Sequence, residues 1–370
     1  MSTLFYISLF LLIIVLLRFF ISLLNYFTRP VLPTAYPPST PLVSILIPAR
    51  NEEKNIERII SGLLAQTYTN IEITVYNDQS TDDTSVIVER YAQKHQNINL
   101  IQGGELPLGW LGKNYGCHQL AQAANGNYLL YLDADVTVSP DFVGNATAYM
   151  QKKQLALLSM FPHQQLQTFG EKMVVPSMNW ILLSLLCLRF VRWSKRRSLA
   201  AANGQMMMFD AKIYNQNLWH EKLKSSPVED IGISRLIKKK KLPMATLLGT
   251  NDISCRMYGS YSQAINGFTK NIAAFFGGSL FVMMIFIIIG TVGPFLVVFG
   301  LPFPLAFLYF FCLISSRMLI SKLSEQSRLI NVFLWPLQHF ALVHLAIKAV
   351  AYTRKKRLTW KGRNVANVKT

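Results

Sequence analysis

The residues that decide the fold are Tyr128-Leu129-Leu130-Tyr131-Leu132-Asp133-Ala134-Asp135. The first five are apolar or aromatic, which is typical of a strand that is buried on both faces. Two carboxylates follow at its carboxyl end, where open α/β sheets bind ligands. Mg²⁺ is often held by one or two carboxylates together with substrate phosphates, so the pair predicts a metal-bridged diphosphate. Taken alone, the pair fits a turn acid that caps the next helix equally well.

Strand and helix patterns alternate along this part of the chain. Residues 55–66, for example, place isoleucines and leucines at the spacing of one helix face. Such alternation predicts right-handed βαβ units and a largely parallel sheet, so the expected fold class is α/β. The expected strands are 42–48, 71–76, 98–102 and 128–132, and the expected helices are 55–66, 82–95 and 114–124.

Near the N-terminus, residues 4–24 form an apolar stretch that is long enough to span a bilayer and contains one charge, Arg18. It lacks a basic region before it and a small-residue cleavage pattern after it, so we expect an uncleaved anchor. Arg29 follows the stretch and no charge precedes it. By the positive-inside rule, the following domain is expected in the cytosol.

Three more apolar segments follow towards the C-terminus, and Gly293-Pro294 is expected to kink or break the first of them. Four crossings in total would leave the basic tail outside, against the positive-inside rule. We therefore expect that one segment does not cross or is a hairpin, with the segments that contain Pro294 and Pro336 as the candidates. The segments are 273–298, 301–316 and 332–351; a further apolar run, 178–191, is too short to span and is expected to be interfacial or buried.

The net charge of +18 raises the alternative of nucleic-acid binding. The lysines and arginines cluster beside the apolar segments, however, where anionic lipid headgroups explain them better. We therefore expect membrane lipids, and no nucleic acid, among the partners. The four cysteines have no C-x-x-C spacing, which indicates neither a disulfide framework nor a zinc site. The basic clusters are 189–197, 238–241 and 354–363.

These patterns divide the chain into five parts. In order, we expect a transmembrane anchor, a proline-rich linker, an α/β domain, a C-terminal transmembrane region and a basic tail. Their expected ranges are 1–27, 28–41, 42–272, 273–351 and 352–370.

Polar motifs close the other expected strands as well. Asp78 directly follows a strand, where its carboxylate can accept hydrogen bonds from a nucleobase N–H or a ribose hydroxyl. Lys113 ends a glycine-spaced loop before a helix, and its ammonium group suits phosphate oxygens. Asn51 fits a helix cap, and Glu52 fits a ligand contact. The motifs are Pro48-Ala49-Arg50-Asn51-Glu52, Asn77-Asp78-Gln79-Ser80-Thr81-Asp82-Asp83 and Gly109-Trp110-Leu111-Gly112-Lys113.

In this order, the motifs P-x-R-N-E, N-D-x-S-x-D, G-x-x-G-K and D-A-D resemble those of the family 2 glycosyltransferases over residues 43–270. The resemblance implies the GT-A fold, a Rossmann-like domain with a mostly parallel sheet, here with transmembrane helices on both sides. It also implies a UDP-sugar donor and Mg²⁺ or Mn²⁺ as the cofactor. By the same resemblance, Asp78 contacts the uracil, Asp133 contacts the ribose and the metal, and Asp135 binds the metal. Pro48, Arg50, Glu52, Ser80 and Lys113 complete the implied donor site.

The same resemblance implies a catalytic base further along the chain, in an E-D pair followed by a helix that ends in R-L. This chain offers Glu229-Asp230 and then Arg235-Leu236, so Asp230 is the implied base. An inverting transfer needs such a carboxylate, because the acceptor loses its proton as its oxygen attacks the anomeric carbon. The structural alternative is an acid pair that the helix dipole favours.

The chain departs from the family pattern at one place. Many membrane members carry Q-x-x-R-W over the diphosphate, whereas this chain has Gln263 and Asn266 without the Arg-Trp pair. Arg256 or Lys270 is expected to supply the missing positive charge. This pattern, together with Trp360-Lys361-Gly362-Arg363, resembles the branch that glycosylates carotenoid acids and related lipids.

We therefore expect an inverting hexosyltransferase that moves a hexose, with glucose as the first expectation, from a UDP-sugar to a lipid-soluble acceptor such as a carotenoid acid or a hopanoid. Transfer to a polyprenyl phosphate, a step in exopolysaccharide assembly, and a non-catalytic membrane scaffold of the same fold are the alternatives. The expected location is the cell (inner) membrane, in a multi-pass protein with a cytosolic catalytic domain.

Overall fold

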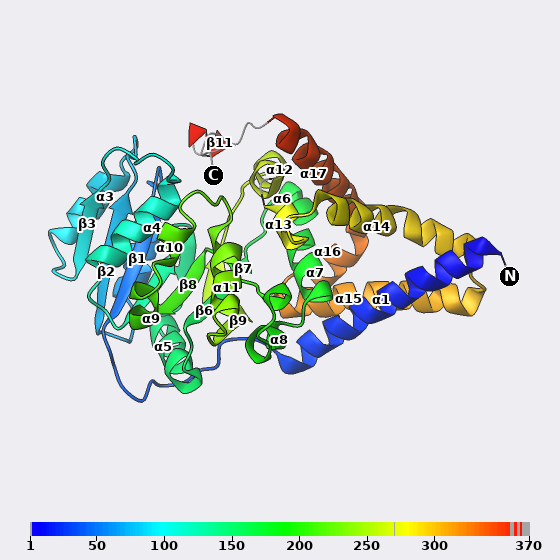
Figure 1. Ribbon diagram of the computed structural model, residues 1–370, viewed down its shortest axis with the longest axis horizontal. Coiled ribbons are helices and arrows are strands. Elements are labelled where there is room, and N and C mark those ends of the chain that lie inside the picture. The colour runs from blue at the N-terminus through cyan, green and yellow to red at the C-terminus, as the bar shows by residue number, and fades with distance from the viewer. Residues whose placement is uncertain (1, 270, 356–358, 361–362, 365–370) are drawn as a thin grey trace. The chain divides into compact units, whose positions relative to one another are not determined.

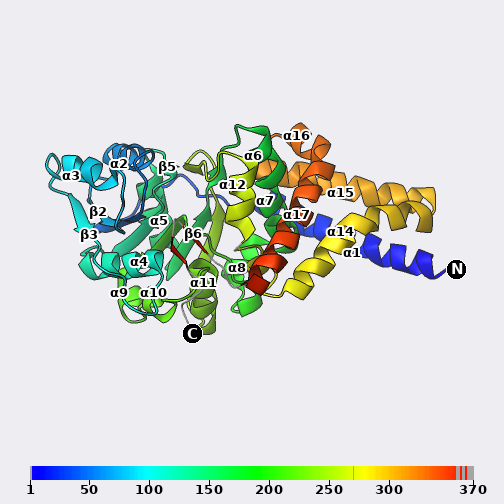
Figure 2. The same ribbon diagram turned by 90° about the horizontal axis from the view of Figure 1, so that it is seen from above.

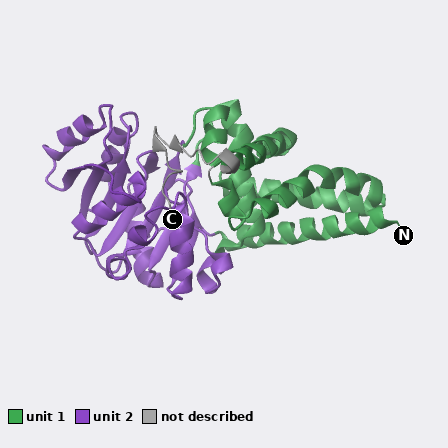
Figure 3. Cartoon of the chain, turned by 45° about the horizontal axis from the view of Figure 1, so that its top comes forward, with its two compact units in different colours: residues 1–29, 164–189, 257–356 green, residues 30–163, 190–256, 357–370 purple. Residues whose placement is uncertain are grey.

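The computed structural model describes residues 2–269, 271–355, 359–360 and 363–364 (Figure 1). The chain forms two compact units, which are described separately (Figure 3). We call them the helical unit (residues 1–29, 164–189 and 257–356) and the sheet unit (residues 30–163, 190–256 and 357–370). Residues 164–189 and 257–272, which the sequence placed in the α/β domain, thus group with the helical unit.

The sheet unit contains a seven-stranded mixed sheet with the order β3-β2-β1-β4-β8-β6-β9. Only β8 runs antiparallel to both of its neighbours among the described pairs, β4 and β6; the other pairs are parallel. The expected mostly parallel sheet is confirmed. The strands are β1 (Val43–Ala49), β2 (Ile71–Asn77), β3 (Ile98–Gln102), β4 (Tyr128–Leu132), β6 (Leu157–Phe161), β8 (Met206–Asp210) and β9 (Met244–Leu248); a smaller sheet joins β5 (Val136–Val138), β10 (Ile253–Cys255) and β7 (His163–Gln164).

Helices cover both faces of this sheet. α2 and α3 lie on one face, and α4 lies on the other (Figure 2). Right-handed crossovers require this arrangement, because the strand order reverses between β1 and β4. The reversal places the carboxyl ends of these two strands at the ligand crevice of the fold. The helices are α2 (Ile56–Leu64), α3 (Thr84–Ala92), α4 (Gly112–Ala123), α5 (Phe142–Lys153), α9 (Ala211–Asn215), α10 (Trp219–Lys222) and α11 (Glu229–Lys239).

The centre of the sheet is apolar on both faces. Ile45 of β1 lies opposite Ile73 of β2 and Leu130 of β4, and all three side chains are fully buried. Each such side chain contributes about 1.5–3 kcal/mol to folding. The strands that carry the polar motifs at their ends, β1, β2 and β4, are therefore part of the buried core.

The expected linker is attached to the sheet unit along its length. The carbonyl oxygen of Pro30 accepts the N–H of Leu248 in β9 at 2.7 Å, and the hydroxyl of Tyr68 donates to the carbonyl of Pro41 at 2.5 Å. Val31 also forms a parallel bridge with Leu248. The proline-rich segment is thus a strap on the sheet unit.

The helical unit contains three helices that are long and apolar enough to cross a membrane: α1, α14 and α15. Ser8, near the start of α1, donates to the carbonyl of Leu296, near the end of α14, at 2.8 Å. Lys322, near the end of α15, donates to the hydroxyl of Tyr26, near the end of α1, at 2.8 Å. Hence α1 runs parallel to α15 and antiparallel to α14. The helices are α1 (Thr3–Thr28), α6 (Phe169–Val174), α7 (Pro176–Leu185), α12 (Tyr261–Thr269), α13 (Ile272–Phe275), α14 (Leu280–Gly300), α15 (Phe303–Leu323), α16 (Arg328–Phe333) and α17 (Trp335–Lys355), while α8 (Leu188–Trp193) spans the boundary between the units.

Of the kink or break expected at Gly293-Pro294, the break is corrected. α14 runs through these residues, since a proline inside an apolar helix frees few backbone groups and neighbouring groups satisfy them. The interruption lies earlier, at Gly277 and Gly278, whose φ values of 73° and 89° suit glycine.

The last apolar segment, 332–351, is divided between α16 and α17. Among the described helices, α17 is not one of those apolar enough to span. Its Gln338, His339, His344 and Lys348 explain this.

Candidate active site

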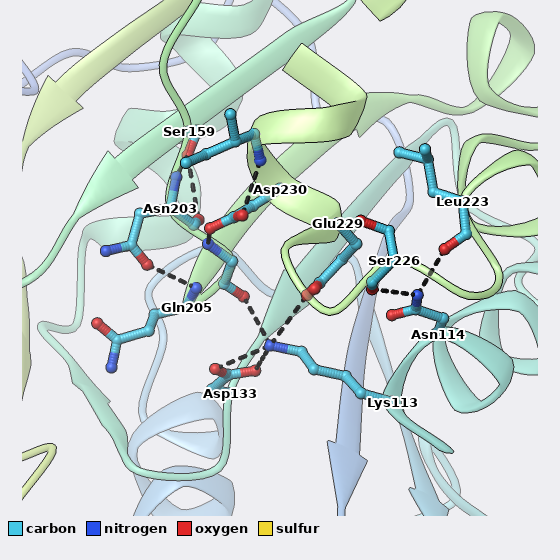
Figure 4. A network of polar contacts seen from close by, with 12 residues as sticks. Lys113, Asn114, Asp133, Ser159, Asn203, Gln205, Leu223, Ser226, Glu229 and Asp230 are labelled. Atoms are coloured by element: carbon cyan, nitrogen blue, oxygen red, sulfur yellow. Dashed lines mark hydrogen bonds and ion pairs between the residues drawn. The ribbon is translucent and has the colours of Figure 1, made fainter. Parts of the chain in front are cut away.

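The candidate site lies at the carboxyl end of β4, next to the reversal of strand order. Lys113 is the second residue of α4, and its Nζ lies 2.7 Å from Oδ1 of Asp133 and 3.5 Å from Oε1 of Glu229 (Figure 4). One ammonium group therefore links the end of β4 to the first residue of α11. The predicted residues Lys113, Asp133 and Glu229 are thus in contact, although they are far apart in the sequence.

The charge of Lys113 is held in place by these two carboxylates. Burial acts to lower its pKa, but Asp133 and then Glu229 raise the pKa well above its usual value. The side chain of Lys113 is 23% exposed and that of Glu229 is 11% exposed, so solvent screens the pair weakly. The ammonium group remains charged across the physiological range.

Asp230 points to the backbone of a neighbouring loop. Its Oδ2 accepts the N–H of Gly204 at 2.9 Å, and its Oδ1 accepts the N–H of Ile231 at 2.7 Å (Figure 4). Burial and then the charge of Glu229 raise the pKa of Asp230 to about 7, although these two N–H groups and Lys113 act in the opposite direction. The carboxyl group can therefore gain and lose a proton near neutral pH.

Gly204 allows the two sides of the site to approach. A Cβ atom at this position would lie 3.2 Å from Oε1 of Glu229 and 3.4 Å from Nζ of Lys113. The carbonyl oxygen of Gly204 also accepts from Nζ of Lys113 at 3.4 Å. Its loop is fixed on the other side, because the Oγ of Ser159 in β6 accepts the N–H of Asn203 at 2.8 Å.

Asn114 holds the loop that leads into α11. Its side-chain amide donates to the carbonyls of Leu223 at 2.7 Å, Ser226 at 2.9 Å and Lys224 at 3.3 Å (Figure 4). The N–H of Leu111 adds a bond to the carbonyl of Lys224 at 2.8 Å. Two adjacent residues of α4 therefore hold α11 and the loop before it: Asn114 binds the loop, and Lys113 binds the first residue of α11.

Asp135 carries the feature that points to a bound cation. Its Oδ1 is buried and has no hydrogen-bond partner. Burial and then the charges of Asp133 and Glu52 raise the pKa of Asp135 to about 6. A carboxylate with a buried, unpartnered oxygen and a second carboxylate two residues away suit a hard divalent cation. The described residues include no cluster of three or more His, Cys, Asp or Glu side chains that could hold a metal ion.

A second group of predicted residues joins the ends of β1 and β2. Nη1 of Arg50 donates to the carbonyl of Asp78 at 2.5 Å and lies 3.8 Å from its Oδ2. The Oγ of Ser80 accepts the N–H of Asn51 at 2.9 Å. Asn51, with a φ of 52°, does not cap α2; its side-chain oxygen accepts the N–H of Thr81 at 2.9 Å. The two loops are thus bonded to each other.

Three of the remaining predicted donor-site residues lie in or shortly after strands, and the fourth lies outside the described residues. Pro48 lies within β1, Glu52 follows it, and Arg256 directly follows β10. Lys270 lies outside the described residues. Within the basic run 238–241, Lys238 is buried, and its ammonium group donates to the carbonyls of Val191 and Ser194. This member of the run is a structural residue and not a headgroup contact.

Sequence reasoning missed four residues of the network. Gly204, Asn114, Asn203 and Ser159 position the acids or Lys113, but no local motif marks them. Asn203-Gly204-Gln205 directly precedes a buried strand, and a polar loop at the end of a core strand was the one available signal.

Comparison with known proteins identifies the class of the domain that carries most of this site. Residues 44–214 match the model of the family described as Glycosyl transferase family 2. These residues form a family 2 glycosyltransferase domain. The match includes β1 to β4 with their strand-end motifs, Lys113 and the acid pair; Glu229 and Asp230 lie beyond it. The protein is accordingly a glycosyltransferase enzyme.

Relatives with assigned names support this class. The chain is 26% identical over 265 residues to a 4,4'-diaponeurosporenoate glycosyltransferase of Staphylococcus haemolyticus. The alignment covers 69% of this chain and 67% of the relative. It is 25% identical over 263 residues to the protein of the same name in Staphylococcus aureus strain MRSA252, with coverages of 70% and 68%.

A solved structure shares the fold of the glycosyltransferase domain. The mannosyltransferase PcManGT of Pyrobaculum calidifontis, solved with GDP-Man and Mn²⁺, superposes with a TM-score of 0.54. The alignment covers 92% of this chain and 99% of that chain at 16% identity, which establishes a common GT-A fold.

Proposed function

We propose that this glycosyltransferase moves a hexose, with glucose as the first candidate, from a UDP-sugar to a lipid-soluble acceptor at the cytosolic face of the cell (inner) membrane. The observation that carries the proposal is the contact of Lys113 with both Asp133 and Glu229. It joins a cation suited to a diphosphate to the first residue of α11, the helix whose second residue, Asp230, is the proposed base. A donor and an acceptor bound on the two sides of Lys113 would be neighbours.

The donor half consists of the strand-end residues of β1, β2 and β4. Asp78 would accept from the uracil and Asp133 from the ribose, with Pro48, Arg50, Glu52 and Ser80 around the nucleotide; Arg256 and Lys270 would add positive charge. A Mg²⁺ or Mn²⁺ ion at Asp133 and Asp135 would supply positive charge to the leaving diphosphate. The buried, unpartnered oxygen of Asp135 supports this part of the proposal. The mannosyltransferase PcManGT was solved with GDP-Man, so a GDP-sugar is the competing donor.

The acceptor half follows from the names of the relatives and from the helical unit. The relatives act on diaponeurosporenoate by name, which is a carotenoid acid. Three helices of the chain are long and apolar enough to span a membrane. They would place the enzyme at the lipid bilayer, in which such an acceptor dissolves. A carotenoid acid or a hopanoid is therefore the proposed acceptor class.

Asp230 is the proposed base of an inverting transfer. Its pKa of about 7 matches the range in which a base is both ionised and able to take a proton. A hydroxyl acceptor must lose a proton during attack, whereas a carboxylate acceptor is already ionised at neutral pH. The need for Asp230 should therefore depend on the group that the acceptor presents.

The test uses the purified full chain in nanodiscs with UDP-glucose or GDP-mannose and either a polyene acid or a hydroxylated hopanoid. We expect transfer from UDP-glucose, with inversion at the anomeric carbon by NMR. Asp230→Asn should lower transfer to the hydroxyl acceptor about 10²–10⁴-fold, lower transfer to the acid much less, and leave UDP binding intact. Equal activity of Asp230→Asn on the hydroxyl acceptor would refute the base, and exclusive use of GDP-mannose would refute the donor.

A further inference from the structure

Two arginines lie on the membrane-spanning helices of the helical unit, Arg18 in α1 and Arg317 in α15. Ionisable residues within such helices are energetically costly and mark functional sites by default. Both guanidinium groups lie over the same ring: their Cζ atoms are 4.0 Å and 4.7 Å from the ring centroid of Trp180 in α7. Two like charges are thus held against one aromatic side chain.

No carboxylate balances these charges in the described part of the chain. Among the described residues, neither Arg18 nor Arg317 forms an ion pair with a carboxylate. The partners of the two guanidinium groups are neutral: the Oγ of Ser184 accepts from Arg18 at 2.8 Å and 3.2 Å, and the Oε1 of Gln338 accepts from Arg317 at 2.7 Å. Two positive charges therefore remain uncompensated.

The position of Arg317 is fixed by a buried polar network. The amide of Gln338 donates to the side-chain oxygen of Asn331 at 2.9 Å, and Asn331 donates to the Oγ of Ser321 at 2.9 Å. Arg317 itself is 5% exposed, and its Nε is buried without a hydrogen-bond partner. The Nε–H of Arg317 is thus an unused hydrogen-bond donor on a fixed, charged and buried side chain, and an oxygen atom of a ligand would satisfy it.

We propose that Arg18 and Arg317 bind the oxyanion head of a membrane-soluble amphiphile, with the head beside the ring of Trp180. Guanidinium groups bind carboxylates and phosphates through parallel N–H bonds, and two of them match one anionic head. The shared chemistry has two sources: the acid end of an apolar acceptor, or the phosphate of an anionic phospholipid. The site does not depend on the proposed transfer reaction, because it lies entirely within the helical unit.

The test measures binding of a conjugated polyene fatty acid, cis-parinaric acid, to the full chain in phosphatidylcholine nanodiscs, through energy transfer from tryptophan. Its methyl ester has the same apolar body without the charge. We expect the acid to bind at least 10-fold more tightly than the ester. Arg317→Gln should remove this preference, and Arg328→Gln, which removes an exposed arginine of α16 in the same unit, should leave it intact.

Adding phosphatidylglycerol distinguishes the two sources. If the site serves a phospholipid, the anionic lipid displaces the acid from the wild type and has no effect on Arg317→Gln. If the site serves an acid acceptor, the acid remains bound in its presence. Arg18→Gln carries the same test if Arg317→Gln does not yield folded protein. Equal binding of acid and ester by the wild type, or equal losses in Arg317→Gln and Arg328→Gln, would overturn the proposal.

Discussion

At the scale of single residues, Gly204 sets the separation between Lys113 and the acids of α11. In Gly204→Ala the new methyl group would lie 3.2 Å from Oε1 of Glu229 and 3.4 Å from Nζ of Lys113, closer than most Cβ contacts. We expect transfer to fall at least 10-fold while the melting temperature changes little, since the charged side chains can shift outward.

The matched control is Gly104→Ala, because a Cβ atom there meets nothing within 4 Å. Steady-state transfer and thermal unfolding of the two variants separate the steric effect from the general cost of replacing glycine. Equal activity of both variants would show that the close approach has no catalytic role.

We predict that ionisation of Asp135 lowers the free energy of unfolding at high pH. Its folded-state pKa is about 6, and an unfolded aspartate ionises near pH 4. Between these values the folded state binds more protons, so the free energy of unfolding falls as the pH rises. Asp135→Asn should therefore raise the melting temperature at pH 8 in EDTA and leave it unchanged near pH 4. The gain is at most about 1.4 kcal/mol for each pKa unit.

The same variant should lose metal-dependent binding of the donor. Asp83→Asn is the control, since Asp83 is exposed and makes no side-chain capping bond. Scanning fluorimetry at the two pH values and titration with UDP in Mn²⁺ measure the two effects. A stability gain of Asp135→Asn at both pH values would contradict the linkage argument.

At the scale of secondary-structure elements, α4 positions α11 through the loop before it. Asn114→Ala removes three hydrogen bonds to the carbonyls of Leu223, Lys224 and Ser226. Leaving buried carbonyls unpaired costs about 1–3 kcal/mol. We expect lower stability and a lower kcat with little change in the KM of the donor, because the loop bears on α11 and not on the strand-end motifs. Asn70→Ala, which removes one exposed bond to Thr40, is the control.

The elements were largely predictable, whereas the contacts between them were not. The sequence predicted the bounds of β3 and β4 as the structure has them, because a continuous apolar run marks β4 and a short segment rich in isoleucine and leucine marks β3. Lys113 and Asp133 were predicted to belong to one donor site, because the family resemblance assigned both motifs to it. The roles of Gly204 and Asn114 depend on partners in distant segments, so no local pattern contained them.

At the scale of the whole molecule, three membrane crossings would remove the conflict with the positive-inside rule. With α1, α14 and α15 as the crossing helices, the sheet unit and the basic tail follow an odd number of crossings and share one side. We predict that this side is the cytosol and that the connection between α14 and α15 is external.

Cysteine labelling in intact cells tests this topology. The native cysteines Cys117, Cys187, Cys255 and Cys312 are buried, which keeps the background low. Phe303→Cys, at the start of α15, should react with an impermeant maleimide in intact cells, and Asp83→Cys should react only after lysis. Reaction of both in intact cells would contradict the predicted orientation.

The central place of β4 has a consequence for the order in which the enzyme fails on heating. β4 is hydrogen-bonded on both sides, to β1 and β8, so its amides should exchange with solvent only when the whole unit unfolds. Asp133 and Asp135 follow that strand, whereas Asp230 lies in α11, outside the sheet. Warming should therefore abolish sugar transfer first and leave an enzyme that still holds its nucleotide.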